Sequence, residues 1–296
     1  MRQAFYRSRT GRRLNRVVYA PGGLVRAGAV LVHGLGEHAG RYADVAHIFT
    51  SRGIVLCGVD LPGSGRSGGR RGDMRGLWEG VLAISECAEH LDAMLPVGAP
   101  KGIVGHSFGA FLSLAFLRRF PGMFRFCWLS SPLLEPARSV GKWKRRLALA
   151  IEPICPWARV DNGVRSEGCT RDPGAMERLR ADPLMHRRVS LRVGRMLMDE
   201  APEIMACGLA GDIQVLVTQG LGDPVCPPDV TRSYFDSIGV GDKELREFEG
   251  LLHEPFRDIG GGAVLAAVGD WLDRILKAEA EGRKTVSSLC SATARP

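Results

Sequence analysis

The sequence predicts a doubly wound α/β fold, in which helices cover both faces of a mostly parallel central sheet. Short apolar runs rich in β-branched residues alternate with segments of helical period, such as Tyr42, Val45, Ala46 and Phe49. Apolar residues make up 45% of the chain and charged residues 24%, as in globular proteins. A length of 296 residues is compatible with one α/β body that carries an insertion.

The individual elements follow from these patterns in order along the chain. Two runs that flank the turn signal Thr10-Gly11 predict an antiparallel hairpin at the N-terminus. The remaining strands and helices then alternate until residue 131 and again from residue 213. The expected strands are Ala4–Ser8, Leu14–Tyr19, Ala29–His33, Ile54–Asp60, Gly102–Gly105, Phe124–Leu129, Ile213–Gln219 and Glu244–Glu249, and the expected helices lie around Tyr42–Phe49, Trp78–Leu95, Ala110–Phe120, Asp229–Ile238 and Val264–Ile275.

Residues 132–211 break this alternation, because they contain several prolines, two amphipathic helical stretches and no convincing strand. We therefore expect an α/β core formed by residues 1–131 and 212–278, with a mainly helical insertion at 132–211. The polar segment 279–296 is expected to be a disordered tail.

Charge and cysteine content limit the possible partners. The net charge of +8 is concentrated in residues 1–16, with six arginines and no acid, and in residues 132–211, with 14 basic and 10 acidic side chains. Such a surface could attract anionic lipid headgroups, or it could be a solvated basic face; we expect no nucleic-acid partner. The eight cysteines show neither zinc-site spacing nor a disulfide framework, so we expect no metal and no cofactor.

The sequence contains no run of ~18 apolar residues that would predict a membrane span. It also lacks the 7–15-residue apolar stretch of a signal peptide near its N-terminus. These two features predict a cytoplasmic protein.

Two stretches match the pattern Gly-x-Ser-x-Gly, which in an α/β fold can place a nucleophilic serine on a tight turn between a strand and a helix. Ser107, in Gly105–Gly109, follows a predicted strand directly and precedes a predicted helix. Ser67, in Gly65–Gly69, lies several residues beyond its strand and is assigned to a flexible loop. Ser107 is therefore the expected nucleophile.

The order of partners in this arrangement is serine, acid, histidine, with the histidine just before the last helix. Among the seven histidines, His253 alone lies beyond the resumed strands. Asp223 is the first carboxylate after the strand Ile213–Gln219, whereas the alternatives Asp229 and Asp236 fall at the start of a helix and within it. We expect Asp223 to orient His253, and His253 to accept the proton of Ser107.

A serine nucleophile also requires hydrogen-bond donors for the oxyanion of the tetrahedral intermediate. We expect these donors to be the backbone N–H of Phe108, directly after the nucleophile, and that of Leu35, in the loop after the first buried strand. Gly34 and His106, which precede Leu35 and Ser107, are expected to contact the substrate.

Three stretches together resemble the monoglyceride lipase and lysophospholipase group, the serine aminopeptidase branch of the α/β-hydrolases. They are the ten residues from His33 to Tyr42 (HGLGEHAGRY), the segment from Asp60 to Ser67 (DLPGSGRS), and Gly105–Gly109. The likeness spans about residues 5 to 277. It implies an α/β-hydrolase fold with a lid at 132–211, an acyl-binding tunnel, and hydrolysis of monoacylglycerols or lysophospholipids through an acyl-enzyme intermediate.

Departures from the family pattern leave the head group open. Ala110 stands where many members have glycine, Phe108 where many have methionine, and the insertion matches mainly around Asp182-Pro183-Leu184. The alternatives are an acyltransferase or aminopeptidase with the same triad, or a non-catalytic ligand-binding member of the fold. The net basic lid favours acyl esters over substrates that carry an amine.

The lid also suggests a second property. Its two amphipathic stretches carry basic residues beside apolar ones, with Lys142, Lys144, Arg145 and Arg146 in the first of them. Such helices can enter a lipid interface, and a lid packed on the core explains the same pattern. The pattern therefore leaves two interpretations open, peripheral membrane contact through the basic lid or packing on the core, and the sequence does not define an oligomeric state.

Overall fold

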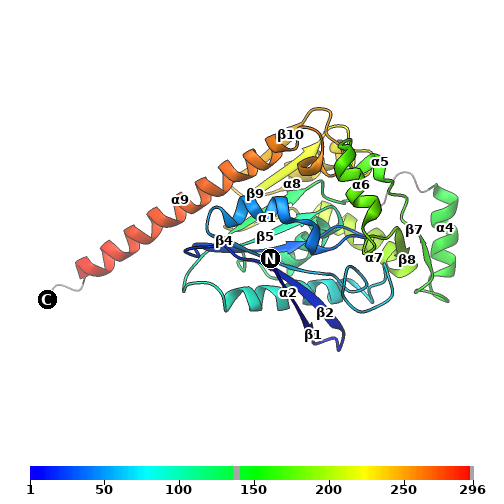
Figure 1. Cartoon of the computed structure of the whole chain (residues 1–296), viewed down its shortest axis with the longest axis horizontal. Helices are drawn as coiled ribbons and strands as arrows, with labels where there is room; N and C mark the ends of the chain where they lie inside the picture. Colours follow the sequence, from blue (N-terminus) through cyan, green and yellow to red (C-terminus); the bar gives the residue numbers. More distant parts are fainter. Residues whose placement is uncertain (136–140, 294–296) are drawn as a thin grey trace.

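A computed structural model describes residues 1–135 and 141–293, without the side chains at 142, 144, 145 and 282–293 (Figure 1). Its main sheet has eight strands in the order β1-β2-β4-β3-β5-β6-β9-β10 within this part of the chain. The strands from β4 to β10 in this order pair in parallel, and the hairpin of β1 and β2 adds two antiparallel strands at one edge. The predicted fold class is therefore confirmed. The strands are β1 (Arg2–Arg7), β2 (Arg13–Tyr19), β3 (Ala27–Val32), β4 (Ile54–Val59), β5 (Lys101–His106), β6 (Phe126–Ser130), β9 (Gln214–Gly220) and β10 (Lys243–Phe248).

Helices cover both faces of this sheet. One apolar core joins a sheet face to the helices α2, α3 and α8, and a second core joins the opposite face to α1 and α9. Because each face is covered, β3 and β4 are buried along their whole length and read as continuous apolar runs. These helices are α1 (Ala43–Thr50), α2 (Leu77–Asp92), α3 (Phe108–Arg119), α8 (Pro228–Ser237) and α9 (Gly262–Thr293), with short 3₁₀ turns at Ala39–Arg41 and Pro255–Arg257.

The strand order creates a crevice at one point of the sheet. From β3 the chain crosses first to β4 on one side and then to β5 on the other side. The loops that leave the carboxyl ends of β3 and β5 therefore diverge to opposite faces, which is where open α/β sheets bind ligands. Val32 and Gly105, near the ends of these strands, are partners in the register.

The segment 132–211 leaves the sheet after β6 and returns before β9. It is more varied than the sequence predicts, because it contains a two-stranded antiparallel sheet as well as helices. The two strands have only three residues each, which is too short for an alternating pattern to be recognised, so periodicity does not reveal them. The elements are α4 (Lys142–Ile151), β7 (Arg159–Asp161), α5 (Ser166–Cys169), α6 (Pro173–Ala181), β8 (Arg188–Ser190) and α7 (Leu191–Ala206).

The last helix also differs from expectation. We expect a disordered tail from residue 279, but α9 continues to Thr293 and projects from the body at the end remote from α4 (Figure 1). Its extension from Lys277 to Glu281 consists of alanine, lysine and glutamate, which are strong helix formers. Among the described helices, none is both long and apolar enough to cross a membrane.

Candidate active site

Ser107 lies on the turn between β5 and α3, at the carboxyl edge of the sheet. Its backbone has φ 54° and ψ −117°, a strained conformation for a residue with a side chain. The flanking glycines are required by close packing: a Cβ at Gly105 would lie 2.6 Å from the Cα of Ala110, and one at Gly109 would lie 2.0 Å from the carbonyl oxygen of Val32. The turn therefore depends on both glycines of the Gly-x-Ser-x-Gly pattern.

The structure brings together the three side chains that the sequence singles out. Ser107 Oγ lies 3.0 Å from Nε2 of His253, and Nδ1 of His253 lies 2.9 Å from Oδ2 of Asp223. With the Nδ1–H donating to the carboxylate, Nε2 is free to accept the hydroxyl proton of Ser107. All three side chains are almost fully buried. This geometry allows the serine to act as a nucleophile and the histidine as its general base.

The Asp223 carboxylate is held rigidly by its own loop. Oδ1 accepts the backbone N–H groups of Val225 and Cys226 at 2.8 and 3.0 Å, and Oδ2 also accepts the side-chain amide of Gln219 at 3.2 Å. Burial alone would raise the pKa of Asp223, but His253 and these donors outweigh that effect and lower the pKa. The carboxylate therefore stays ionised against the imidazole.

The pKa of His253 is set by two opposed effects. Burial alone would lower the pKa of the imidazole, but the Asp223 carboxylate, with a smaller contribution from Cys226, outweighs burial and raises the pKa well above 6.5. The neighbouring His106 shows what burial does without such a partner: burial, with a smaller contribution from His253, lowers the pKa of His106 to about 4. His106 is therefore neutral at physiological pH, and its ring packs against His253 with centroids 4.9 Å apart.

The predicted oxyanion donors lie on the two loops that flank the crevice. Phe108 is the first residue of α3, so its N–H has no acceptor within the helix. In the loop after β3, the N–H of Gly34 is already engaged by Glu37 Oε1 at 2.6 Å, which leaves Leu35 as the next donor along the chain. A Cβ at Gly34 would lie 3.4 Å from the Cβ of Ser107, so this loop approaches Ser107 closely.

Ser67, the serine of the second Gly-x-Ser-x-Gly stretch, is bonded to other partners and takes no part in this cluster. It lies in a loop, as expected, but it is buried rather than free to move. Its Oγ–H donates to the carbonyl of Asp60 at 2.5 Å and its Oγ accepts the N–H of Asn15 at 2.8 Å. These bonds join the loop of Gly65–Gly69 to β2 and to the residue directly after β4, so Ser67 has a structural function.

A buried cluster of two carboxylates and two arginines supports the histidine loop, and sequence reasoning did not assign it a role. Arg41 binds Glu37 through Nη1 at 2.5 Å and Glu254 through Nη2 at 3.0 Å, and Arg257 binds Glu254 at 2.8 Å. Glu254 directly follows His253, whereas Glu37 and Arg41 belong to the loop after β3. The adjacency of Glu254 to His253 was the available signal, but the sequence does not show that Arg41 lies beside it.

This cluster remains charged although it is buried. Burial alone would raise the pKa of Glu254, but Arg41 and Arg257 outweigh that effect and lower the pKa to about 2. The pKa of Glu37 is held well below its usual range for the same reason, mainly by Arg41. The ionised carboxylates therefore fasten the loop of His253 to the loop of Leu35.

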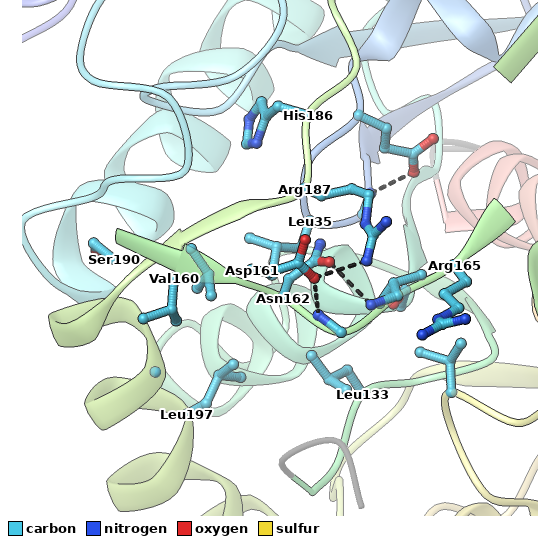
Figure 2. Close-up of a pocket in the computed structure, with 18 of the residues that line it drawn as sticks. Leu35, Leu133, Val160, Asp161, Asn162, Arg165, His186, Arg187, Ser190 and Leu197 are labelled. Carbon is cyan, nitrogen blue, oxygen red and sulfur yellow. Dashed lines mark hydrogen bonds and ion pairs between the residues drawn. The ribbon is translucent and has the colours of Figure 1, made fainter. Parts of the chain in front are cut away.

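A cavity of about 1120 Å³ lies between the cluster of Ser107 and His253 and the segment 132–211. Gly34, Leu35 and His106, three of the predicted site residues, also line it. In Figure 2, Leu133, Val160 and Leu197 form an apolar part of the wall, while Arg187 pairs with Asp161 at 2.8 Å in a polar part. The volume and the mixed lining suit a small molecule with a long apolar portion.

The segment 132–211 is attached to the core through polar contacts. His38 Nε2 lies 2.8 Å from Oδ2 of Asp182, and the guanidinium of Arg192 binds both carboxylate oxygens of Asp73. The backbone N–H of His186 also donates to the carbonyl of Gly36 at 2.9 Å. The segment therefore forms the outer wall of the cavity above Ser107.

Comparison with known proteins gives consistent matches. The family model described as serine aminopeptidase, S33, matches residues 24–260. A monoacylglycerol lipase of Mycolicibacterium smegmatis is 29% identical over 86% of this chain and 91% of its own length, and the phospholipase YtpA of Bacillus subtilis is 28% identical over 77% and 88%. The crystal structure of a monoacylglycerol lipase from Paleococcus ferrophilus superposes with a TM-score of 0.79 at 30% identity, covering 88% of this chain and 98% of that one.

The buried cluster generates a stability prediction. Glu254→Gln should destabilise the protein by roughly 3–5 kcal/mol at pH 7, because it leaves the buried arginines under-compensated. Since the folded-state pKa of Glu254 is lowered to about 2, its ionised form stabilises the fold above the unfolded-state pKa of ~4.3, and this contribution is lost as the pH falls towards 2. Urea unfolding should therefore show a smaller gap between wild type and variant at pH 3 than at pH 7.

Glu249→Gln is the matched control, because Glu249 is an exposed carboxylate four residues before His253. This variant should stay within ~0.5 kcal/mol of wild type at both pH values. Equal stability of Glu254→Gln and wild type at pH 7 would contradict the structural role of the cluster.

Proposed function

Because the chain belongs to the serine aminopeptidase S33 family of α/β-hydrolases, we propose that it is a serine hydrolase that cleaves the carboxylic esters of single-chain lipids. The observation that carries this proposal is the hydrogen-bonded chain from Ser107 through His253 to Asp223, placed beneath a large and partly apolar cavity. Monoacylglycerols and lysophospholipids are the proposed substrates; the relatives in M. smegmatis and B. subtilis are named as a monoacylglycerol lipase and a phospholipase.

In the proposed mechanism, Ser107 Oγ attacks the ester carbonyl while Nε2 of His253 takes its proton. Asp223 keeps the imidazole in the required tautomer and stabilises the imidazolium that forms. The N–H groups of Phe108 and Leu35 bind the oxyanion of the tetrahedral intermediate, each contributing ~3–4 kcal/mol. His253 then protonates the leaving alcohol, and a water molecule activated by the same histidine releases the fatty acid from Ser107.

Charge in the cavity favours an acyl ester over an aminoacyl substrate. Two carboxylates of the lid that line the cavity are already paired, Asp161 with Arg187 and Asp182 with His38. A substrate ammonium would have to compete with these partners. Glu152 also lines the cavity, so an amine substrate belongs among the compounds tested.

The first test identifies the nucleophile and the substrate class together. Ser107→Ala should abolish labelling by a fluorophosphonate probe, because no other serine of the described chain is bonded to His253. Wild type should release fatty acid from monoacylglycerols or lysophospholipids faster than it cleaves aminoacyl amides. Ser67→Ala is the control, since it removes the other serine of the same pattern and should keep the label.

Product analysis separates the alternatives in this experiment. Transfer of the acyl group to added glycerol, with little free fatty acid, would identify an acyltransferase. Persistent labelling of Ser107→Ala, or no turnover of any ester by the labelled wild type, would contradict the proposed hydrolase.

The raised pKa of His253 predicts a characteristic pH profile. His253 must be neutral to accept a proton, and Asp223 raises its pKa well above 6.5, so kcat/KM should rise with an inflection above pH 6.5. Asp223→Asn removes the negative charge, so it should lower kcat by ~10⁴ and move the inflection to lower pH. An unchanged profile in this variant, or a rate close to that of wild type, would point to another acid.

We also propose that the lid contacts a lipid surface. Apolar side chains on its outer elements are exposed: Trp143 66%, Leu147 52%, Ile154 77%, Trp157 46% and Val160 47%. Exposed arginines stand on α4 (Arg146), on β7 (Arg159) and on β8, the strand paired with β7 (Arg188). Of the basic residues singled out in the first lid stretch, Lys142, Lys144 and Arg145 have side chains outside the described part of the structure.

A combination of apolar and cationic side chains suits the surface of an anionic bilayer, where apolar groups enter the interface and arginines attract headgroups. Val160, Asp161 and Arg187 line the cavity as well. A bilayer at this face would therefore lie next to the space that receives the acyl chain. Release of a lipid from the bilayer into the cavity would then require only a short transfer.

Vesicle binding tests this contact. Ile154→Asp should weaken binding to vesicles of phosphatidylcholine and phosphatidylglycerol about tenfold, because a buried side chain of this size contributes ~1.5–3 kcal/mol. Val97→Asp is the control: Val97 is fully exposed but precedes β5, so it lies at the opposite edge of the sheet. Equal loss in both variants, or binding that neither variant changes, would contradict contact through the lid.

A further inference from the structure

A thiol with no part in the proposed chemistry lies beside the catalytic base. Cys226 is 2% exposed, three residues after Asp223, and its backbone N–H donates to Oδ1 of that residue. This turn directs the thiol towards the pair of Asp223 and His253. A carboxylate oxygen, a sulfur and an imidazole nitrogen from these three residues all lie within 4.8 Å of one another.

We infer that Asp223, Cys226 and His253 form an inhibitory binding site for a thiophilic divalent cation such as Zn²⁺. Thiolate, imidazole and carboxylate are the ligands that zinc takes in proteins. Bond lengths of ~2.0–2.3 Å would separate the ligand atoms of a tetrahedral ion by roughly 3.3–3.7 Å. Here Nδ1 and Oδ2 lie 2.9 Å apart, and one ligand atom from each of the three residues lies within 4.8 Å of the other two, so small side-chain movements would produce zinc geometry.

The ion can reach this site through the cavity. Ser107 and His253 line the cavity. Val225, which directly precedes Cys226, lines it as well. The site is enclosed on its other sides, since Asp223 and Cys226 are both buried. An ion that enters from the cavity therefore reaches the imidazole before it is fully enclosed.

Binding would stop catalysis by occupying the base. Zn²⁺ replaces the proton of the Cys226 thiol, which passes to solvent, and the proton on Nδ1 of His253 moves to Nε2 so that Nδ1 can bind the ion; no group is oxidised or reduced. The imidazole that otherwise accepts the proton of Ser107 becomes a metal ligand, and so does the carboxylate that orients it. The bound enzyme would keep its fold, but Ser107 would not be activated until a chelator removes the ion.

A spectroscopic experiment tests the site without relying on hydrolysis. Co²⁺ added to wild type should bind at one equivalent and produce a thiolate-to-cobalt charge-transfer band, which Zn²⁺ then displaces. This band and its stoichiometry are independent of the proposed function, so they test the metal site even if the chain hydrolyses no ester. In parallel, Zn²⁺ should block fluorophosphonate labelling of Ser107, and a chelator should restore it.

Variants at the thiol give the decisive comparison. Cys226→Ala and Cys226→Ser should both lose the charge-transfer band. The Zn²⁺ concentration that halves the activity of each variant should also be at least ~10–100-fold higher than for wild type. Loss of a residue that only bonds to a metal ligand already lowers metal affinity by this factor. Cys169→Ala is the matched control: Cys169 is a buried thiol that lines the cavity, and its carbonyl accepts the N–H of Glu254.

Wild-type zinc sensitivity in Cys169→Ala, together with its loss in both Cys226 variants, would support the site. A charge-transfer band that persists without Cys226 would overturn it. Equal zinc sensitivity of wild type and both Cys226 variants, or no binding of Co²⁺ to wild type, would overturn it as well.

Discussion

The contact of 3.0 Å between Nε2 of His253 and Oγ of Ser107 joins residues that lie 146 positions apart. No local feature of the chain can set such a distance, so it depends on how firmly two loops are held at one edge of the sheet. One loop is fixed by the strained turn after β5. The other is fixed by Glu254, which Arg41 and Arg257 bind in the interior. Breaking these ion pairs would leave charges buried, which makes the cluster costly to open and the position of His253 well defined.

The turn after β5 shows how packing rather than propensity determines a catalytic geometry. A side chain at position 105 or 109 would overlap the backbone of α3 or β3. With glycine at both positions, the start of α3 approaches β3 closely, and Ser107 is left in a conformation that an isolated peptide would avoid. The cost of that strain is offset by the apolar contacts of α3, whose ten residues from Phe108 to Leu117 are all buried. The same approach places the N–H of Phe108 near the loop of Leu35.

These relations explain which parts of the protein could be predicted from its sequence. Strands such as β4 and helices such as α2 are long, periodic and buried, so hydrophobic pattern locates them to within about two to three residues. The meeting of Ser107 and His253 could be predicted because the order of strands restricts which loops lie at the same edge of the sheet. The partners of Glu254 were not identifiable, since an ion pair between distant loops leaves no periodic trace. The short strands β7 and β8 were missed for a related reason, because three residues are too few to show a period.

Burial gives the imidazole of His253 two properties that are difficult to separate. In a medium of low dielectric constant the attraction of Asp223 is strong, so it raises the pKa of the imidazole against the effect of burial and makes His253 a strong base. A carboxylate that orients an imidazole and increases its basicity also improves it as a metal ligand. In the absence of the thiol, two ligands would hold a metal ion weakly, and the imidazole would bind a proton in preference to the ion. Cys226 supplies a third ligand from the same loop that carries Asp223, so the geometry that makes His253 an effective base also makes the site susceptible to a thiophilic cation.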